Sequence, residues 1–411
     1  MSFQKPKGTQ DFYPDEMAQR NAVFDVLRRV ARRYGFREIS SPAFEGLELL
    51  TKKEGEEIKQ QIFVLEKKGE EEYGLRFDLT VPFTRMFMEK DKELAKPVKW
   101  FAIDRVWRYE RQQKGRLREF YQFDAEIFGS DRIASDAEVI LLAIDSLKAF
   151  GLTEKDFFVK LNSRALLQSL IVPYLGKASV EEAIFAIDKK GKLSPEAFLA
   201  ELRKIGAQAK EIAEIIMTPL EKLKPSTKEG VRELGKLQGI MGLLGENRKL
   251  VRFDLSLARG LAYYTGIVFE IFDSEEKFRA ILGAGRYDQM VEQFGGKPAP
   301  ATGFALGYST LTLLLSDKGL LPSPKEGVGY YVAPVSEKEM PSALELVSAL
   351  REKTSAETDV MGRNLSNQFK YASKIGAKKV IVVGEAELKS GVFTVKDMKT
   401  GKEEKRKRSE L

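Results

Sequence analysis

The 411-residue sequence contains no histidine and no cysteine. Their absence excludes the Ser-His and Cys-His pairs of nucleophilic catalysis, thiolate chemistry, disulfides, and the usual zinc sites with nitrogen or sulfur ligands. Any catalysis must therefore depend on carboxylates, arginine, lysine, hydroxyl groups, groups of the substrate itself, or Mg²⁺. The sequence assigns no ligands to a metal ion.

The sequence also lacks any apolar run near the roughly 18 residues that a membrane span requires, and its start lacks the apolar core of a signal peptide. We therefore expect a soluble, cytoplasmic protein. The length predicts roughly two to three domains, and a hydrophobic content of 43% is sufficient for a core in each. With 68 Lys and Arg against 61 Asp and Glu, the net charge of +7 admits a polyanionic partner.

A row of polar side chains is predicted on one strand near residue 122. Residues 98–128 predict two strands joined by a polar loop, and side chains alternate between the two faces of a strand. One face then carries Phe120, Gln122, Asp124 and Glu126, and the other carries Tyr121, Phe123, Ala125 and Ile127 as ordinary core. Such a row indicates either a solvated face or the floor of a polar ligand site, beside which Arg108 and Glu110 could project.

Changes in composition and in expected secondary structure along the chain predict its domains. Residues 163–247 consist of short charged helices and predict an inserted helical domain, which divides residues 1–162 from 248–320. A linker rich in Gly and Pro ends near residue 326, and alternating strands and helices in 326–411 predict a small parallel or mixed α/β sheet. The last residues, 399–411, hold six basic and three acidic side chains and are expected to be frayed.

Several separated segments together resemble a known enzyme family. They are residues 7–12 (KGTQDF), 75–82 (LRFDLTVP), 107–110 (WRYE), 118–124 (REFYQFD), 259–266 (RGLAYYTG) and 285–288 (GRYD). The first four resemble class II aminoacyl-tRNA synthetases, and the last two resemble the signatures of the histidyl-tRNA synthetase family. The resemblance implies an α/β fold with an α+β catalytic core, in which helices flank an antiparallel sheet, followed by a C-terminal α/β anticodon-binding domain.

The resemblance also implies the activity. A histidine–tRNA ligase activates L-histidine with ATP and transfers it to tRNA(His). In the family, the positions of Asp78, Thr80 and Gln122 hold the amino group of the substrate. Those of Glu126 and Tyr264 read the imidazole. Tyr263 and Tyr287 are assigned to the same histidine site.

The ATP site and the catalytic groups follow from the same resemblance. Arg108 is similar to the arginine that grips the α-phosphate, and Arg259 to the one that contacts this phosphate from the other side. Glu110 and Phe120 match positions that bind and stack the adenine, and Arg116 is assigned to the ATP site. Two guanidinium groups can offset charge on a pentavalent phosphorus without proton transfer, so a chain without histidine can form an adenylate. The substrate carboxylate is the nucleophile, and pyrophosphate leaves with Mg²⁺.

Two positions depart from the family pattern. After residues 303–307 (GFALG) the family has Glu-Arg, whereas this chain has Ser309 and Thr310, and Ala262 replaces the usual Asp. The missing arginine normally contacts ATP. The main alternative is therefore a non-catalytic paralogue that senses histidine as a regulatory subunit, and a third possibility is a tRNA-binding or scaffolding protein that keeps only the fold.

The C-terminal segment resembles the family's anticodon-binding domain best over residues 362–372 (GRNLSNQFKYA). Lys370, Lys374, Lys378 and Lys379 would supply charge for phosphates, and Phe369 or Tyr371 would either stack a base or be buried. The family also implies a homodimer, with the strand before Pro42 near the interface.

Overall fold

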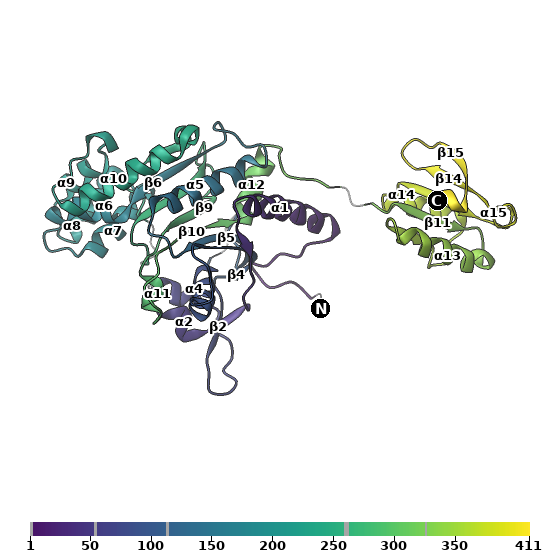
Figure 1. Cartoon of the computed structure of the whole chain (residues 1–411), viewed down its shortest axis with the longest axis horizontal. Helices are drawn as coiled ribbons and strands as arrows, with labels where there is room; N and C mark the ends of the chain where they lie inside the picture. The colour runs from purple at the N-terminus through teal and green to yellow at the C-terminus, as the bar shows by residue number, and fades with distance from the viewer. Residues whose placement is uncertain (1–2, 53–55, 112–114, 259–262, 325–326) are drawn as a thin grey trace. The chain divides into compact units, whose positions relative to one another are not determined.

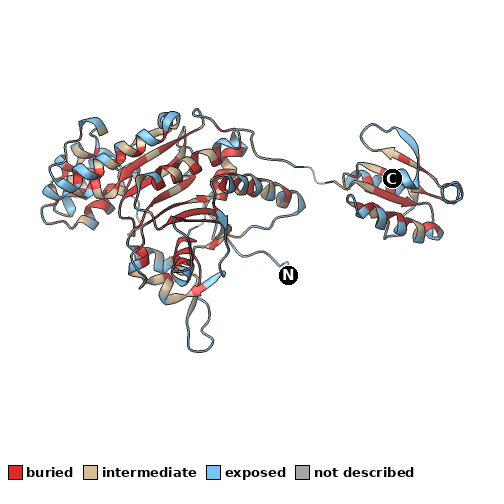
Figure 2. Ribbon diagram, in the orientation of Figure 1, coloured by how far each residue is buried: buried red, intermediate tan, exposed pale blue. Residues whose placement is uncertain are grey.

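The computed structural model describes residues 3–52, 56–111, 115–258, 263–324 and 327–411. The chain divides into two compact units, residues 1–11 with 21–322 and residues 12–20 with 323–411. Figure 1 shows a broad sheet in the larger unit and a separate sheet in the smaller one. Buried residues follow the strands of both sheets, whereas the outer faces of the helices are exposed (Figure 2).

The larger unit contains an eight-stranded sheet. In sheet order its strands are β1 (Arg37–Glu38), β4 (Val98–Trp107), β5 (Glu119–Phe128), β10 (Ala301–Gly307), β9 (Leu282–Arg286), β8 (Ile267–Asp273), β6 (Phe157–Ser163) and β7 (Val251–Phe253). The pairings at the two edges are parallel, and those between them are antiparallel. The predicted antiparallel sheet with flanking helices is therefore confirmed.

One face of this sheet packs against α1 (Pro14–Arg33), α5 (Ile133–Lys148) and α12 (Tyr308–Asp317). The apolar stripe of α1 is buried, and Phe24 contacts the rings of Tyr121 and Tyr308 at centroid distances of 5.2 and 5.4 Å. Phe123 meets Phe304 of the neighbouring strand at 5.3 Å. The set of β5 residues predicted as ordinary core therefore lies on this covered face.

The opposite face carries the site. There α4 (Thr80–Lys90) packs on β5, and the rings of Phe87 and Phe128 stack at 4.8 Å. Nearby elements are β2 (Phe44–Gly46), α2 (Leu47–Thr51), α3 (Glu56–Gln61), β3 (Tyr73–Leu75) and α11 (Met290–Gln293). Because α4 begins at Thr80, its first turn brings polar side chains to the edge of the polar row on β5.

Five helices lie between β6 and β7 in the chain. They are α6 (Arg164–Ile171), α7 (Val180–Asp188), α8 (Pro195–Lys204), α9 (Ala209–Ile216) and α10 (Lys228–Leu243), and they group together beside β6 (Figure 1). Leu166, Ile212 and Leu237 are fully buried. These helices fall within the predicted insertion 163–247, whose boundaries stay a prediction.

The smaller unit has a five-stranded sheet in the order β12 (Ala356–Thr358), β11 (Tyr330–Pro334), β13 (Lys379–Val383), β14 (Val392–Asp397) and β15 (Glu403–Lys407). The first three strands are parallel and the last two antiparallel. Its helices are α13 (Met340–Arg351), α14 (Leu365–Lys374) and α15 (Glu385–Ser390). The predicted α/β sheet is thus present.

The prediction of a frayed end was wrong. β15 pairs with β14 over five residue pairs, and Lys396 forms an ion pair with Glu403 across the two strands at 3.0 Å. The residues of β15 are all charged and largely exposed, so no alternation of apolar side chains marks the strand. Backbone pairing at the sheet edge and cross-strand charge pairs hold it instead.

Within the described ranges, none of the helices combines the length and the apolar character needed to cross a membrane.

Candidate active site

One face of β5 carries a row of buried polar side chains. Gln122, Asp124 and Glu126 keep 6%, 0% and 1% of their surface exposed. This burial decides between the two interpretations of the row, because the face is covered and not solvated.

Small residues on neighbouring strands make room for this row. Gly303 of β10 pairs with Glu126, and a Cβ atom at Gly303 would come within 1.6 Å of the Glu126 carboxylate. Gly285 of β9 continues the same line across the sheet, and a Cβ there would come within 2.5 Å of the Tyr264 ring. The two glycines therefore let a carboxylate and an aromatic ring lie directly on the sheet.

Glu126 is held by two hydroxyl groups. Thr80 donates a hydrogen bond to one carboxylate oxygen at 2.9 Å, and the Tyr287 hydroxyl donates to the other. Burial raises the pKa of Glu126 to about 8, although both hydroxyls oppose the shift. The carboxyl group is thus fixed in place, and in the empty site it keeps its proton to a higher pH than an exposed glutamate does.

Asp78 and Arg108 lie beside this group. Asp78 accepts a hydrogen bond from the Val81 N–H at 3.2 Å, and burial raises its pKa to about 6 while Arg108 opposes the rise. Arg108 donates from Nε to the Phe77 carbonyl at 2.9 Å, and its guanidinium lies 5.5 Å from the centroid of the Phe120 ring. Both contacts fix the direction of the Arg108 side chain.

Two adjoining cavities lie over the polar row. The inner cavity, of about 180 Å³, is lined by Phe77, Asp78, Thr80, Arg108, Gln122, Glu126, Tyr263, Tyr264, Tyr287, Gly303, Phe304 and Ala305. All seven residues predicted for the histidine site are among them. The outer cavity, of about 550 Å³, is lined by Arg108, Glu110, Arg116 and Phe120, the four residues predicted for ATP, together with residues from β6, β8, β9, β10 and α12. The two cavities share Arg108, Gln122 and Ala305.

Three other positions from the sequence bear on this site. Ser309 and Thr310, where the family has Glu-Arg, both line the outer cavity. Arg259, the second predicted catalytic arginine, lies outside the described residues, so the structure places only Arg108 of the pair.

Charged side chains dominate the outer cavity. Arg116 forms an ion pair with Glu110, and Lys160 forms one with Glu276 at 3.0 Å. In all, the cavity is lined by four basic side chains (Arg108, Arg116, Lys160, Arg279) and five acidic ones (Glu110, Asp188, Asp254, Glu270, Glu276). No group of three or more acidic side chains within the described part of the chain is arranged to hold a metal ion.

Lys160, on β6, and Arg279, between β8 and β9, were not predicted from the sequence. Neither belongs to a recognisable motif, and they join the cavity only because β8 and β6 follow β9 in the sheet. No local sequence signal could have found them.

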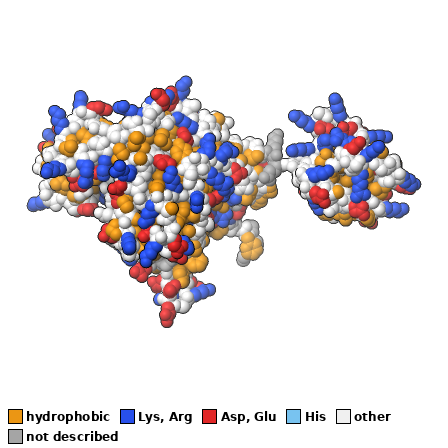
Figure 3. Space-filling view, viewed as in Figure 1, with side chains coloured by type: hydrophobic (Ala, Val, Ile, Leu, Met, Phe, Trp, Pro, Cys, Tyr) orange, Lys and Arg blue, Asp and Glu red, His pale blue; other side chains and the backbone are white. Residues whose placement is uncertain are grey.

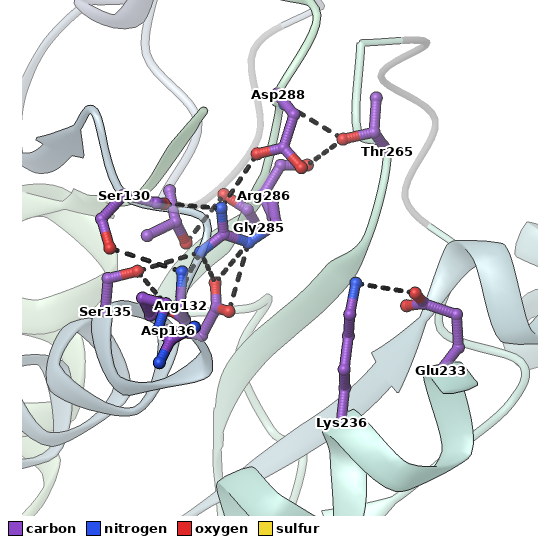
Figure 4. Close-up of polar contacts among 11 residues, drawn as sticks. Ser130, Arg132, Ser135, Asp136, Glu233, Lys236, Thr265, Gly285, Arg286 and Asp288 are labelled. Carbon is purple, nitrogen blue, oxygen red and sulfur yellow. Dashed lines mark hydrogen bonds and ion pairs between the residues drawn. The ribbon is translucent and has the colours of Figure 1, made fainter. Parts of the chain in front are cut away.

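A buried arginine fixes the segment that follows Tyr264 (Figure 4). Arg286 donates from Nε to Asp136 at 3.0 and 3.2 Å and from Nη1 to Asp288 at 2.9 Å. Its backbone carbonyl accepts from the Thr265 N–H at 2.8 Å, and the Thr265 hydroxyl accepts from the Asp288 N–H at 3.0 Å. These contacts hold the chain after Tyr264 against β9, and Tyr264 therefore keeps its place in the inner cavity.

Known families account for nearly the whole chain. A family profile described as histidyl-tRNA synthetase matches residues 8–311, and one described as anticodon binding domain matches residues 330–411. The histidine–tRNA ligase of Haloarcula marismortui is 39% identical over 409 residues, which cover 97% of this chain and 94% of that protein. The chain belongs to the histidyl-tRNA synthetase family. The family resemblance inferred from the motifs is thereby confirmed, and with it the expectation of a histidine–tRNA ligase.

Further relatives agree with this assignment. The histidine–tRNA ligase of Pyrococcus horikoshii is 37% identical over 414 residues, 97% of this chain and 95% of that protein. The crystal structure of the histidyl-tRNA synthetase from Nostoc sp. PCC 7120 superposes with a TM-score of 0.81 at 26% identity and covers 99% of this chain and 97% of that one. A Bacillus halodurans structure described as an ATP phosphoribosyltransferase regulatory subunit/histidyl-tRNA synthetase has a TM-score of 0.77 at 23% identity, covers 93% of this chain and 99% of that one, and shares the fold.

Proposed function

We propose that the inner cavity of this histidine–tRNA ligase binds L-histidine, that the outer cavity binds ATP, and that the two substrates react beside Arg108. The supporting observation is that two sets of residues, assigned separately from sequence, line two adjoining cavities that share Arg108 and Gln122. A carboxylate in the inner cavity and an α-phosphate in the outer one would both reach the same guanidinium.

In the inner cavity, Glu126 would accept a hydrogen bond from the imidazole. Its two oxygens already accept from Thr80 and Tyr287, and a carboxylate has further lone pairs for a ligand N–H. Tyr263 and Tyr264 would contact the ring. An amino acid without an N–H group at this place would leave the remaining lone pairs of the buried Glu126 carboxyl group without a donor, which penalises the wrong substrate.

The α-ammonium group of histidine would meet Asp78, Thr80 and Gln122. Asp78 has its pKa raised by burial to about 6. A bound cation would favour the ionised form, because opposite charges attract strongly where water is excluded.

In the outer cavity, Arg108 would contact the α-phosphate, Phe120 would stack the adenine, and Glu110 and Arg116 would bind the nucleotide. Arg259 would approach the phosphate from the other side, as the resemblance implies. The carboxylate oxygen of histidine attacks the α-phosphorus, the bond to the bridging oxygen breaks, and pyrophosphate leaves. No general base is needed, which is consistent with a chain that lacks histidine.

The outer cavity offers carboxylate oxygens, the donors that Mg²⁺ prefers, although no three of them are grouped as a metal site in the described residues. Five acidic side chains against four basic ones would repel a free triphosphate, so we infer that ATP enters with Mg²⁺. One or two of these carboxylates would hold the ion together with phosphate oxygens. Mg²⁺ would offset charge on the leaving pyrophosphate.

Arg279 would take the role of the arginine that the family has at the position of Thr310. Gly307, three residues before Thr310, donates its N–H to the Ile281 carbonyl at 3.0 Å, so the segment that carries Arg279 runs beside the start of α12. Thr310 and Arg279 line the same cavity. A guanidinium from this segment would serve the terminal phosphates in place of one from α12.

The exchange of radioactive pyrophosphate into ATP, measured with each of the twenty amino acids, tests this proposal. We expect exchange with histidine alone. If histidine binds and no exchange occurs, the chain is the histidine-sensing paralogue instead. If Glu126→Gln leaves the histidine KM unchanged, the inner cavity is not the histidine site.

The smaller unit would bind the anticodon arm of tRNA(His). Its residues 330–411 contain 16 Lys and Arg against 12 Asp and Glu, a net charge of +4 out of +7 for the whole chain. Figure 3 shows basic side chains over much of the visible face of this unit. Lys370, Lys374 and Lys378 are exposed, whereas Lys379 lies 3.8 Å from Glu404.

The two proposed base-stacking residues are half-buried. Tyr371 packs against Tyr331 at a centroid distance of 5.8 Å and lies under the Arg363 guanidinium at 4.3 Å. Phe369 packs against the same apolar cluster. We expect tRNA binding to weaken with salt and to fall sharply when residues after Pro322 are deleted. An unaltered affinity of the truncated chain would exclude the smaller unit from the tRNA site.

We also propose that the protein forms a homodimer and acts in the cytoplasm. β1 forms an edge of the eight-stranded sheet, which supports pairing of two chains near the residues before Pro42. Sedimentation velocity would distinguish the expected homodimer from a monomer. We also place the ligase in the cytoplasm, where tRNA is used.

A further inference from the structure

Asp124 is a buried carboxylate to which the proposed reaction assigns no role. It is 0% exposed, and neither of its oxygens has a hydrogen-bond partner of ordinary geometry among the residues that the structure describes, although the Leu79 N–H faces it. Buried polar groups in native proteins nearly always have partners, so an exception requires an explanation.

The strand register places Asp124 under the inner cavity. It lies two residues from both Gln122 and Glu126 on the same face of β5, and those two line the inner cavity. Its paired neighbours are Ala102 on β4 and Ala305 on β10, which bring no polar side chain. Asp124 therefore lies beside Ala305, where the two cavities meet, although it lines neither of them.

The charges that face Asp124 come from three elements. Asp78 precedes α4, Glu126 lies on the same strand, and Arg108 follows β4. On its side of the row β10 presents only Gly303, Ala305 and Gly307. Among the residues that the structure describes, three buried carboxyl groups thus face one guanidinium, that of Arg108, and this arrangement lacks positive charge.

A substrate can supply the missing charge. Of the two proposed ligands, ATP is an anion, and the amino acid brings a cationic ammonium group. We propose that Asp124 is a specificity-determining residue which makes the inner cavity require a cationic α-ammonium group on its ligand. The inference rests on the proposed histidine site and extends it to a residue behind the cavity wall.

The charge of Asp124 in the empty cavity depends on whether its carboxyl group holds a proton. Burial raises the pKa of Asp124 well above its ordinary value, Glu126 and Asp78 raise it further, and Arg108 offsets this in part. The raised pKa favours the neutral acid while the cavity is empty. When the ammonium group binds, the carboxyl O–H bond breaks, the proton leaves to solvent, and the carboxylate remains as a counter-charge.

The experiment compares two ligands that differ only in the ammonium group. Histidine and 3-(imidazol-4-yl)propanoate are titrated calorimetrically into the full-length parent and into Asp124→Asn, which keeps size and shape. We expect histidine to bind about tenfold more weakly to the variant, since one charge interaction is lost, and the propanoate to bind equally or more tightly. Equal changes for both ligands, or no change for either, would overturn the proposal.

Proton release gives a second measurement. Histidine titrations in buffers of different ionisation enthalpy should show protons released by the parent at pH 7 and fewer released by Asp124→Asn. Equal release would contradict the proposal. If Asp124→Asn does not fold, Asp124→Ser, which also removes the charge, is used in the same two measurements.

Glu126→Gln separates this inference from the proposed function. Both ligands retain the imidazole, so this variant should weaken both equally. If it weakens neither, the inner cavity is not the histidine site, and the proposed function fails. If it weakens both while Asp124→Asn does not discriminate between the ligands, only the inference about Asp124 fails.

Discussion

The inner and outer cavities share a wall but are built from different kinds of polar contact. The inner cavity has about 180 Å³ and is built from buried groups whose hydrogen bonds are already formed, such as those from Thr80 and Tyr287 to Glu126. The outer cavity has about 550 Å³ and is lined by ion pairs, such as that between Arg116 and Glu110. The first is suited to read one small molecule, and the second to exchange internal ion pairs for contacts with phosphates and a metal ion.

This difference predicts where substitutions act. A change in the inner cavity should alter histidine use and leave ATP use intact, because its groups are fixed before the ligand arrives. A change in the outer cavity should have the opposite effect and be smaller, because several charges share the phosphates. Groups on the shared wall should affect both.

Arg108→Ala is expected to have the largest effect, because Arg108 lines both cavities. Loss of a guanidinium that stabilises charge in the transition state should lower kcat for pyrophosphate exchange by about 10² to 10³. Arg105→Ala is a matched control, since Arg105 lines neither cavity and lies over the Tyr121 ring at 5.1 Å. If both variants lose activity equally, the shared-wall interpretation fails.

Glu126→Gln should distinguish most clearly between the effects of the two cavities on substrate use. The substitution turns one of the two oxygens that accept from Thr80 and Tyr287 into an NH2 group, which donates and does not accept, and it removes the carboxylate that an imidazole N–H would meet. We expect the histidine KM to rise about 100-fold, with the ATP KM unchanged. Steady-state exchange with each substrate varied in turn measures both. A comparable rise in the ATP KM would show that the cavities are not independent.

Arg279→Ala should act on the outer cavity alone. Because three other basic side chains line that cavity, we expect the ATP KM to rise only about tenfold, with the histidine KM unchanged. Lys277→Ala is the control, since Lys277 pairs with Asp317 and does not line the cavity. Introducing Thr310→Arg into the Arg279→Ala variant should recover ATP affinity. Failure to recover it would mean that the two positions do not serve the same phosphates.

The last expected effect is on stability, through its pH dependence. Burial raises the pKa of Glu126 from 4.5 to about 8, so the folded state holds a proton that the unfolded state has already released between these values. The contribution of Glu126 is complete below pH 4.5 and is lost as the pH rises to about 8, by up to about 1 kcal/mol per pH unit. Calorimetric unfolding of the ligand-free protein from pH 5.5 to 8 should show a flatter dependence in Glu126→Gln. Parallel curves would contradict the raised pKa.

Local patterns predicted the elements well where apolar periodicity was present. The strands 330–334 and 379–383 and the stripe of α1 follow from the spacing of apolar residues. β15 was missed because all of its side chains are charged and its stability comes from pairing with β14. A strand that is stabilised by pairing with its neighbour need not show a strand pattern in its own sequence.

The candidate site, like the fold, could be predicted only in part from local sequence. The motifs predicted which residues belong to each cavity, because their order along the chain is characteristic of one family. They did not find Lys160 or Arg279, and they left open whether the polar row on β5 was solvated. Thr80 and Glu126 lie 46 residues apart, and only packing of α4 on β5 makes them hydrogen-bonded partners.

The sequence alone determined the chemistry that the chain can use. Without histidine or cysteine, its catalysis is limited to carboxylates, arginine, lysine, hydroxyl groups, groups of the substrate itself, or Mg²⁺. The tertiary structure decided which carboxyl groups are buried together, and hence that Asp78, Asp124 and Glu126 have raised pKa values. The reason is that residue types are fixed one position at a time, whereas desolvation and charge interactions depend on groups that distant strands bring within a few ångströms of each other.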